Sequence, residues 1–146
     1  MSSQIEFIKE YSAFIESTVL DEPTFLATLP RYITDESILI EPESLFGRLV
    51  GFDGWKQWHT AAAQMAEVAA VQFSTSGSEF FETDNTVLHY YEVTFTAREG
   101  YPDGFRTSFV ERFELADGKI AKLTEHYADA GALAAFLAPS DPSPMN

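Results

Sequence analysis

The stretch that decides the fold of this chain reads Phe105-Arg-Thr-Ser-Phe-Val-Glu-Arg-Phe-Glu-Leu-Ala-Asp-Gly-Lys-Ile-Ala-Lys-Leu-Thr-Glu-His-Tyr127. Two alternating runs flank the dipeptide Asp117-Gly118. This dipeptide is typical of a two-residue hairpin turn, because glycine readily adopts the positive φ angle that such a turn needs. The sequence therefore predicts a long antiparallel β-hairpin, and the rest of the chain is interpreted around it.

The alternation assigns each side chain of the hairpin to a face, because successive residues of a strand point to opposite sides. The predicted buried face carries Phe105, Thr107, Phe109, Glu111, Phe113 and Leu115 from the first run and Ala121, Leu123, Glu125 and Tyr127 from the second, with Ile120, Lys122, Thr124 and His126 opposite. Glu111 and Glu125 thus lie among aromatic and aliphatic side chains. A buried carboxylate is costly unless it is paired, hydrogen-bonded or protonated, so the hairpin predicts a polar site inside an apolar pocket.

Helical patterns dominate the first part of the chain. Ser2 or Ser3 is the expected cap of a helix that runs to about Val19 or Leu20, with Tyr11 toward the core. Further helices are predicted from Asp21-Glu22-Pro23, from an Asp53 cap through Trp55, Trp58, Ala62 and Met65, and from an Asp129 cap over Ala130–Leu137. These positions make the N-terminal part helical and leave one short helix at the end.

Alternating patterns predict the strands. After a connector at residues 32–35, Ser37–Glu41 forms a strand that Pro42 ends, because proline has no N–H to donate. Strand patterns follow at residues 70–83, with Gly77 as a possible bulge, and at Thr86–Ala97, where Val87, His89, Tyr91, Val93 and Phe95 share one face. Turns are predicted at Asp84-Asn85 and at Gly100–Gly104.

This order of elements predicts an α+β protein, in which the N-terminal helices lie on one side of a curved antiparallel sheet. Together they enclose a cone whose open mouth is a ligand pocket. We expect a single domain over residues 1–137 and a disordered tail over residues 138–146, which is rich in proline and serine.

The net charge and the lack of cysteine limit the classes of binding partner that we expect. The net charge of −14 opposes binding to nucleic acid, which needs lysine and arginine to displace counterions, and it also disfavours anionic membranes. A neutral or cationic small molecule fits better, although the acidity can also serve solubility alone. The absence of cysteine excludes disulfides, a thiol nucleophile and cysteine-based metal sites. We see no signal-peptide pattern and no apolar run of membrane-spanning length, and therefore expect a soluble cytoplasmic protein.

No phosphate-binding glycine loop, Gly-x-Ser-x-Gly elbow or His-Glu-x-x-His motif is present. The histidines, His59, His89 and His126, lack metal-ligand spacing, so we predict neither a metal nor a cofactor, while a site of separated carboxylates with His89 stays open. The ionisable groups on inward positions are Tyr11, Glu41, His89, Tyr91, Glu111 and Glu125. Tyr11 is alternatively an ordinary half-buried tyrosine, and Glu41 a solvated glutamate. Buried carboxyls have raised pKa values, which suits acid–base chemistry near neutral pH.

The layout from Ile5 to Leu137 resembles the nuclear transport factor 2-like superfamily, and in particular its SnoaL-like and ketosteroid isomerase-like branch. The resemblance is carried by Val110-Glu-Arg-Phe-Glu-Leu-Ala-Asp-Gly-Lys-Ile120, Glu125-His-Tyr-Ala-Asp129, Ser37-Ile-Leu-Ile-Glu-Pro42 and Gly51-Phe-Asp-Gly54. It implies a cone-like barrel, the cystatin-like α+β roll. The superfamily includes isomerases, cyclases, dehydratases, epoxide hydrolases and binders without catalysis, so it does not by itself assign an activity.

The resemblance also implies roles for individual residues. Glu41 falls where ketosteroid isomerases keep their general base, and Tyr11 near their oxyanion-hole tyrosine. Glu111 falls where they hold a protonated aspartate and where SnoaL-type cyclases hold a histidine, and Glu125 is similar in position to the acid/base aspartate of those cyclases. This sequence differs from both branches in having glutamate at each carboxylate position.

We therefore expect a cofactor-independent isomerase, cyclase or lyase that acts on a hydrophobic carbonyl compound of polyketide or steroid type. The expected catalytic residues are Glu41, Glu111, Glu125 and Tyr11. The expected substrate-binding residues are Phe14, Trp58, His89, Tyr91, Phe95, Phe109, Phe113 and Tyr127. The alternative is a ligand-binding or dimerisation module, in which Arg48, Arg106 or Arg112 pairs with the glutamates. We also expect a homodimer that forms through the outer face of the sheet, where Val110 and Ile120 are predicted.

Overall fold

The computed structural model describes residues 2–68 and 73–138. Its elements, in chain order, are α1 (Ser3–Thr18), α2 (Glu22–Thr28), a 3-10 helix (Leu29–Arg31), β1 (Ile33–Ile40), β2 (Arg48–Val50), α3 (Gly51–Val68), β3 (Phe73–Thr83), β4 (Thr86–Phe95), β5 (Phe105–Ala116), β6 (Lys119–Tyr127) and α4 (Ala130–Leu137). The strand predicted over residues 70–72 and the disordered tail predicted over 139–146 fall outside the described residues.

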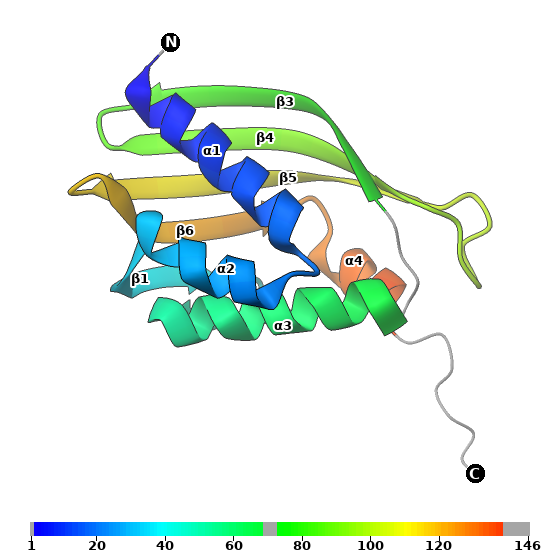
Figure 1. Cartoon of the computed structure of the whole chain (residues 1–146). Helices are drawn as coiled ribbons and strands as arrows, with labels where there is room; N and C mark the ends of the chain where they lie inside the picture. The colour runs from blue at the N-terminus through cyan, green and yellow to red at the C-terminus, as the bar shows by residue number, and fades with distance from the viewer. Residues whose placement is uncertain (1, 69–72, 139–146) are drawn as a thin grey trace.

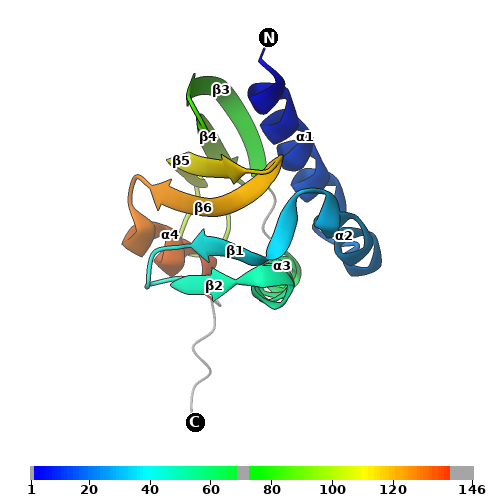
Figure 2. The same cartoon turned by 90° about the vertical axis from the view of Figure 1, so that its left-hand side faces the viewer.

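The sheet is curved and open, with the strand order β2-β1-β6-β5-β4-β3. Helices α1, α2 and α3 cover its concave side, and α4 follows β6 at one end (Figures 1 and 2). The predicted α+β class is confirmed. The sheet is mixed, however, because β1 runs parallel to β6 while all other neighbours are antiparallel. Local patterns predict strands but carry no signal for the direction in which two distant strands pair.

The predicted hairpin is present as β5 and β6, with positive φ angles at Asp117 (52°) and Gly118 (77°) in its turn. One part of the face assignment was wrong. The pairs Glu114↔Lys122 and Leu115↔Ile120 leave Ala121 as an extra residue, which is a β-bulge. A bulge reverses the alternation beyond it, so Ile120 is buried at 1% exposure and Ala121 is exposed.

The predicted helix caps are confirmed at Ser2 and Asp129, whose side chains accept from the Ile5 and Ala132 N–H groups. The predicted second helix begins after Asp21, whose side chain accepts from the Thr24 N–H group. Asp53 is not a cap, because α3 begins at Gly51 and places Asp53 in its first turn. Gly51 has a φ of 69°, and a Cβ there would meet the Asp35 carbonyl oxygen at 2.4 Å, so this entry to the helix requires glycine. Among the described helices, none combines the length and apolarity needed to cross a membrane.

Strand β1 begins at Ile33, four residues earlier than predicted. Its pairing with β6 is irregular between Ile33 and Ile38, where the Ser37 hydroxyl donates to the Ile120 carbonyl at 2.6 Å. The irregularity explains why the residues 32–35 show the pattern of a connector. Beyond it, Leu39 and Glu41 are both buried, as the predicted alternation required.

Two apolar clusters fill the space between the sheet and the helices. The first cluster consists of Ile8, Tyr11, Phe14, Phe25, Leu29, Tyr32, Ile33, Leu39, Leu49, Trp55, Val87, Phe113, Ile120 and Leu123. The second cluster consists of Val93, Phe95, Leu133 and Phe136, with Tyr91, Phe105, Phe109 and Tyr127 among the half-buried side chains packed against them. Strands β4, β5 and β6 each contribute to both clusters, so each strand crosses the boundary between them.

Candidate functional site

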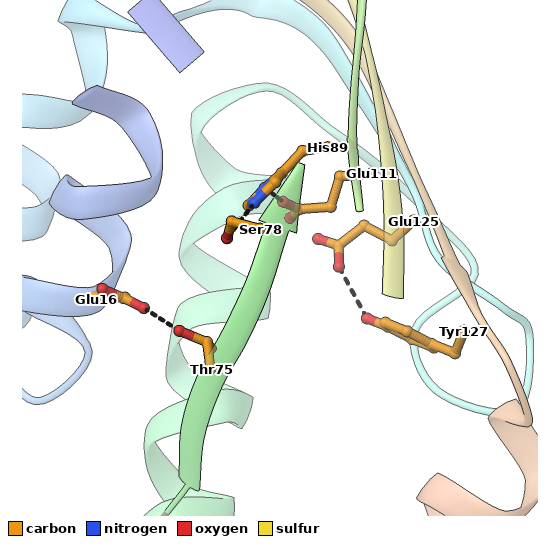
Figure 3. A network of polar contacts seen from close by, with 7 residues as sticks. All are labelled: Glu16, Thr75, Ser78, His89, Glu111, Glu125 and Tyr127. Carbon is orange, nitrogen blue, oxygen red and sulfur yellow. Dashed lines mark hydrogen bonds and ion pairs between the residues drawn. The ribbon is translucent and has the colours of Figure 1, made fainter. Parts of the chain in front are cut away.

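A row of ionisable side chains crosses the concave face of the sheet at that boundary. The strand register pairs Phe80 with His89, His89 with Glu111, and Glu111 with Glu125. Glu41 directly follows Ile40, which is paired with Thr124, so it lies level with Glu125. We call Glu41, Glu125, Glu111 and His89 the polar row. Figure 3 shows three of its members side by side on neighbouring strands.

A cavity of about 750 Å³ opens beside this row. Its walls come from α1, α3, α4 and the concave face of β3 to β6, and Glu125, Glu111 and His89 all line it. The remaining lining is largely aromatic and aliphatic. A volume of this size suits a drug-sized molecule, and a few polar groups in an apolar wall are the usual composition of a small-molecule site.

Most of the aromatic residues predicted to bind substrate do line this cavity. These are Trp58, His89, Tyr91, Phe95, Phe109 and Tyr127. Phe14 and Phe113 lie in the first cluster instead and are not among the lining residues. Phe14 stacks on Phe25 with ring centroids 5.4 Å apart, and Phe113 packs edge-on against Tyr11 at 5.6 Å. The alternation of side chains along a strand does not show whether an inward residue is covered by a helix or faces the open end of the cavity.

The Tyr127 hydroxyl bridges two carboxyls of the polar row. It lies 2.6 Å from Glu41 Oε1 and 2.9 Å from Glu125 Oε2, the second contact being drawn in Figure 3. A phenol carries a single proton and can donate to only one of them. The other short oxygen–oxygen contact then requires a proton on the carboxyl, so the Glu41–Glu125 pair holds at least one proton.

Glu41 is the member best suited to keep that proton. Burial, followed by the negative charge of Glu125, raises the pKa of Glu41 to about 9. Its carboxyl is 3% exposed, lies behind the cavity wall rather than in it, and leaves Oε2 without a hydrogen-bond partner among the described residues. Glu41 was predicted as a catalytic residue, but the structure places it behind Tyr127 and Glu125.

Glu125 faces the cavity directly. Burial and the charge of Glu111 raise its pKa to about 8, while hydrogen bonds from Tyr127 and Glu41 favour its ionised form. A negative charge in this pair is therefore best placed on Glu125, with the proton on Glu41. An ionised carboxylate in an apolar wall, with its donors already in place, is a competent general base.

His89 connects Glu111 to a residue that the sequence did not single out. His89 Nδ1 lies 2.9 Å from Glu111 Oε1, and its Nε2 lies 3.1 Å from Ser78 Oγ (Figure 3). Burial lowers the pKa of His89 to about 4 and raises that of Glu111 to about 8, so the pair carries no net charge at neutral pH. Ser78 follows Gly77, whose predicted bulge is confirmed, and this bulge was the only signal pointing to it.

Tyr11 belongs both to the first cluster and to the cavity wall. Its hydroxyl oxygen accepts a hydrogen bond from Trp55 Nε1 at 3.0 Å. Its own proton has no acceptor within the part of the chain that is described. Burial, and then the charges of Glu111, Glu125 and Glu41, raise the pKa of Tyr11 well above 10, so the hydroxyl remains a donor toward the cavity.

The polar row has no arginine partner among residues 2–68 and 73–138. Arg112 pairs with Glu114 on the outer face of the sheet, and Arg31 pairs with Glu10. Within the same residues, no group of three or more histidine and acidic side chains is arranged to hold a metal ion. The carboxyls of the row contact histidine and hydroxyl groups, and one cationic side chain, Lys9 of α1, also lines the cavity.

Comparisons with known proteins identify the fold. No protein-family model matches the chain, and no curated protein sequence matches it. Solved structures with similar folds include an NTF2-like protein from Burkholderia xenovorans LB400, at 20% identity over 92% of this chain and 95% of that one, with a TM-score of 0.68. A protein of unknown function with a cystatin-like fold from Xanthomonas campestris gives 21% identity, 94% and 99% coverage, and a TM-score of 0.70.

A further similar structure is that of TerC, co-crystallised with polyporic acid, at 20% identity over 93% of this chain and 98% of that one, with a TM-score of 0.65. Several other similar structures are likewise NTF2-like proteins. This chain has the NTF2-like fold, as the sequence resemblance predicted.

Proposed function

We propose that this protein is a cofactor-independent acid–base enzyme, an isomerase, cyclase or lyase acting on a hydrophobic carbonyl compound of polyketide or steroid type. The observation that carries the proposal is the Glu125 carboxyl, which lies in the wall of an apolar cavity with hydrogen-bond donors on its far side. Such a group takes a proton from carbon without needing a metal or a cofactor.

The proposed reaction begins with transfer of a proton from the carbon next to the substrate carbonyl to Glu125. The electron pair of that C–H bond moves onto the carbonyl oxygen and forms an enolate. The Tyr11 hydroxyl donates to this oxygen, because burial raises its pKa and keeps it a neutral donor. The protonated Glu111 carboxyl, which donates to His89 Nδ1, adds no negative charge beside the enolate. Return of the proton to another carbon gives an isomer, and attack of the enolate on a second carbonyl gives a ring.

Glu41 and Tyr127 act through Glu125 in this scheme. Tyr127 donates to the Glu125 carboxylate, and the protonated Glu41 stabilises its charge from behind the wall. Because Glu41 does not line the cavity, we assign it as a positioning residue. Because the pKa of Glu125 is raised to about 8, the ionised fraction that serves as the base grows as pH approaches 8.

The alternative is a binding module without turnover. That module would have its cavity filled by side chains and its glutamates paired with arginines. The cavity of about 750 Å³ and the absence of arginine from the described surroundings of the row both support the enzyme instead. TerC, a structure with a similar fold, was co-crystallised with polyporic acid, which supports a small-molecule ligand for this chain as well.

The test is proton exchange at carbon. A panel of neutral polycyclic ketones is incubated with the protein in D₂O, and deuterium uptake next to the carbonyl is followed by NMR. We expect uptake with at least one ketone and a loss of at least about 100-fold in Glu125→Gln. Glu114→Gln, the same substitution on the outer face of the sheet, is the matched control and should exchange normally. Binding without exchange in the wild-type protein would favour the binding module.

A homodimer remains part of the proposal, on a corrected surface. Ile120 is buried and does not belong to the outer face. That face instead carries the cross-strand pair Phe81 and Leu88, which are 55% and 37% exposed. Large exposed apolar side chains favour contact with another protein surface. Light scattering should give twice the chain mass, and a monomer mass at all concentrations would exclude the dimer.

A further inference from the structure

We propose that Ser78, His89 and Glu111 form a Ser–His–Glu triad, which gives the cavity a second activity, the hydrolysis of hydrophobic esters. The proposal goes beyond proton transfer at Glu125. It starts from the order of the contacts in Figure 3, in which an imidazole lies between a hydroxyl and a carboxyl.

The distances fit the arrangement. His89 Nε2 to Ser78 Oγ is 3.1 Å and His89 Nδ1 to Glu111 Oε1 is 2.9 Å, so both contacts lie within hydrogen-bond reach. The nucleophile and the carboxyl contact different ring nitrogens, as a triad requires. Such triads are recognised by geometry and not by chain order or a surrounding motif. This is why the absence of Gly-x-Ser-x-Gly from the sequence does not count against it.

The imidazole is held in one orientation. Its ring stacks on Phe80 with a centroid distance of 4.2 Å and an interplanar angle of 5°. Tyr91 stacks on it as well, at 4.6 Å and 28°. The side chain of His89 is 7% exposed, so two aromatic rings and burial fix the direction in which both nitrogens point. A general base needs this orientation more than it needs an exposed position.

The serine is presented to the cavity by an irregular strand. Gly77 has a φ of 66°, and the pairing between β3 and β4 shifts between Ser76 and Glu79. This bulge leaves Ser78 out of the regular ladder, and its side chain both lines the cavity and remains accessible to solvent. A nucleophile on a bulge beside a glycine can meet a substrate from the open side of the site.

The chemistry balances with water as the only co-reactant. Ser78 Oγ attacks the ester carbonyl carbon while its proton passes to His89 Nε2, and the resulting imidazolium is stabilised by the Glu111 carboxylate on Nδ1. The C–O bond to the alcohol then breaks, and the alcohol leaves with the proton from His89. Water attacks the acyl-serine by the same route, so ester and water give acid and alcohol. The Tyr91 hydroxyl, which also lines the cavity, is a donor for the developing oxyanion.

The triad predicts a distinctive pH profile. When Glu111 is protonated it donates to Nδ1, so the neutral imidazole carries its hydrogen on Nε2 and cannot accept from Ser78. When Glu111 is ionised it accepts from Nδ1–H, and Nε2 becomes the base. The groups around this pair are Glu125 from β6, Tyr91 from β4, Glu41 after β1, and Tyr11, Glu16 and Lys9 from α1, where Lys9 lies over the Phe80 ring that stacks on His89.

Since burial raises the pKa of Glu111 to about 8, esterase activity should rise with pH through about 8. Proton transfer to Glu125 needs the ionised form of a second carboxyl whose pKa is also about 8, so its pH profile depends on Glu125 as well as on Glu111.

The test uses an alkyl fluorophosphonate, which labels activated serines covalently, and p-nitrophenyl butyrate as the ester. We expect one equivalent of label, mapped by mass spectrometry to Ser78. Ester hydrolysis should fall by at least about 100-fold in Ser78→Ala and in Glu111→Gln, since glutamine donates to Nδ1 and holds the wrong tautomer. Ser76→Ala, which changes an exposed serine of β3 outside the cavity wall, is the matched control and should label and hydrolyse as the wild type does.

Absence of label on Ser78 at pH 9, or unchanged hydrolysis in Ser78→Ala, overturns the proposal. Ser78→Ala removes one accessible hydroxyl, so a failure to fold does not obscure the result. Neither measurement depends on ketone exchange at Glu125, so failure of one proposed activity leaves the other standing.

Discussion

Two buried histidines, His59 outside the polar row and His89 within it, show what distinguishes the closed part of this molecule from the open part. His59 packs against the first cluster, 2% exposed and stacked on Phe25 at 4.0 Å. His89 is 6% exposed and stacked on Phe80 at 4.2 Å. Burial and stacking are nearly the same, so neither separates a structural histidine from a candidate for chemistry.

Their partners do separate them. His59 Nε2 lies 2.6 Å from the Thr18 carbonyl oxygen, which only accepts, so this nitrogen keeps its hydrogen. The partners of His89 are a hydroxyl and a carboxyl, each able to give or take a proton, and both line the cavity. His59 is therefore held by a main-chain acceptor, whereas His89 contacts side chains that can exchange protons with it. The closed part and the open part of the molecule can be tested separately.

The largest effect is expected from two phenylalanines of β5 that flank Glu111. Phe113→Ala should cost about 3–5 kcal/mol of unfolding free energy, because Phe113 is 1% exposed in the first cluster and its removal leaves a void. Phe109→Ala should cost only about 1–2 kcal/mol, because Phe109 is half-buried and already borders the cavity. Urea denaturation measures both, and equal losses would show that the cavity is closed in solution.

The second effect is a pH dependence that originates in Glu41. Its pKa is about 9 in the folded protein against an ordinary 4.5, so the folded state binds more protons between these values. Stability from this group is complete below pH 4.5 and is lost as pH rises toward 9. Glu41→Gln should flatten the decline between pH 5 and pH 9 by at least about 2 kcal/mol. The comparison is made by denaturation at both pH values, and an unchanged slope would show that Glu41 is ionised in the folded state.

Tyr127→Phe tests the hydroxyl that bridges Glu41 and Glu125. Removing the hydroxyl leaves Glu41 Oε1 and Glu125 Oε2 without their donor, which should cost about 1–2 kcal/mol and raise the pKa of Glu125. Tyr32→Phe is the matched control in the first cluster. The Tyr32 ring is 4% exposed and its hydroxyl has no hydrogen bond to the described residues, so the change should stay within about 0.5 kcal/mol. Equal losses of stability in the two variants would show that the Tyr127 hydroxyl contributes no more than the Tyr32 hydroxyl.

The smallest effect is expected from Glu111→Gln. Glutamine keeps the shape and the hydrogen bond to His89 but cannot ionise, so stability at neutral pH should be preserved or raised by up to about 1 kcal/mol. A clearly lower thermal midpoint than the wild type would instead show that Glu111 pairs as an anion with a cationic partner. Above pH 8, ester hydrolysis should be lost in this variant, because glutamine holds His89 in the tautomer that cannot accept from Ser78, and this separates the chemical role from the structural one.

The sequence by itself determined the elements whose causes are local. The Asp117-Gly118 turn follows from the positive φ that glycine allows, and the helix starts at Asp21 and Asp129 follow from one side-chain acceptor near free N–H groups. Strand alternation placed Glu111, Glu125 and His89 on the inner face, because a period of two does not depend on the neighbouring strand.

Only the tertiary structure decided how these side chains meet. The register between β4, β5 and β6 aligns His89, Glu111 and Glu125, and the parallel pairing of β1 with β6 brings Glu41 level with them across more than eighty residues of chain. The bulges at Ala121 and Gly77 buried Ile120 and placed Ser78 beside His89. Such pairings depend on long-range contacts that no local pattern encodes. For the same reason, the sequence predicted a buried carboxylate at position 111 but could not show that a histidine and a serine would complete its hydrogen bonds.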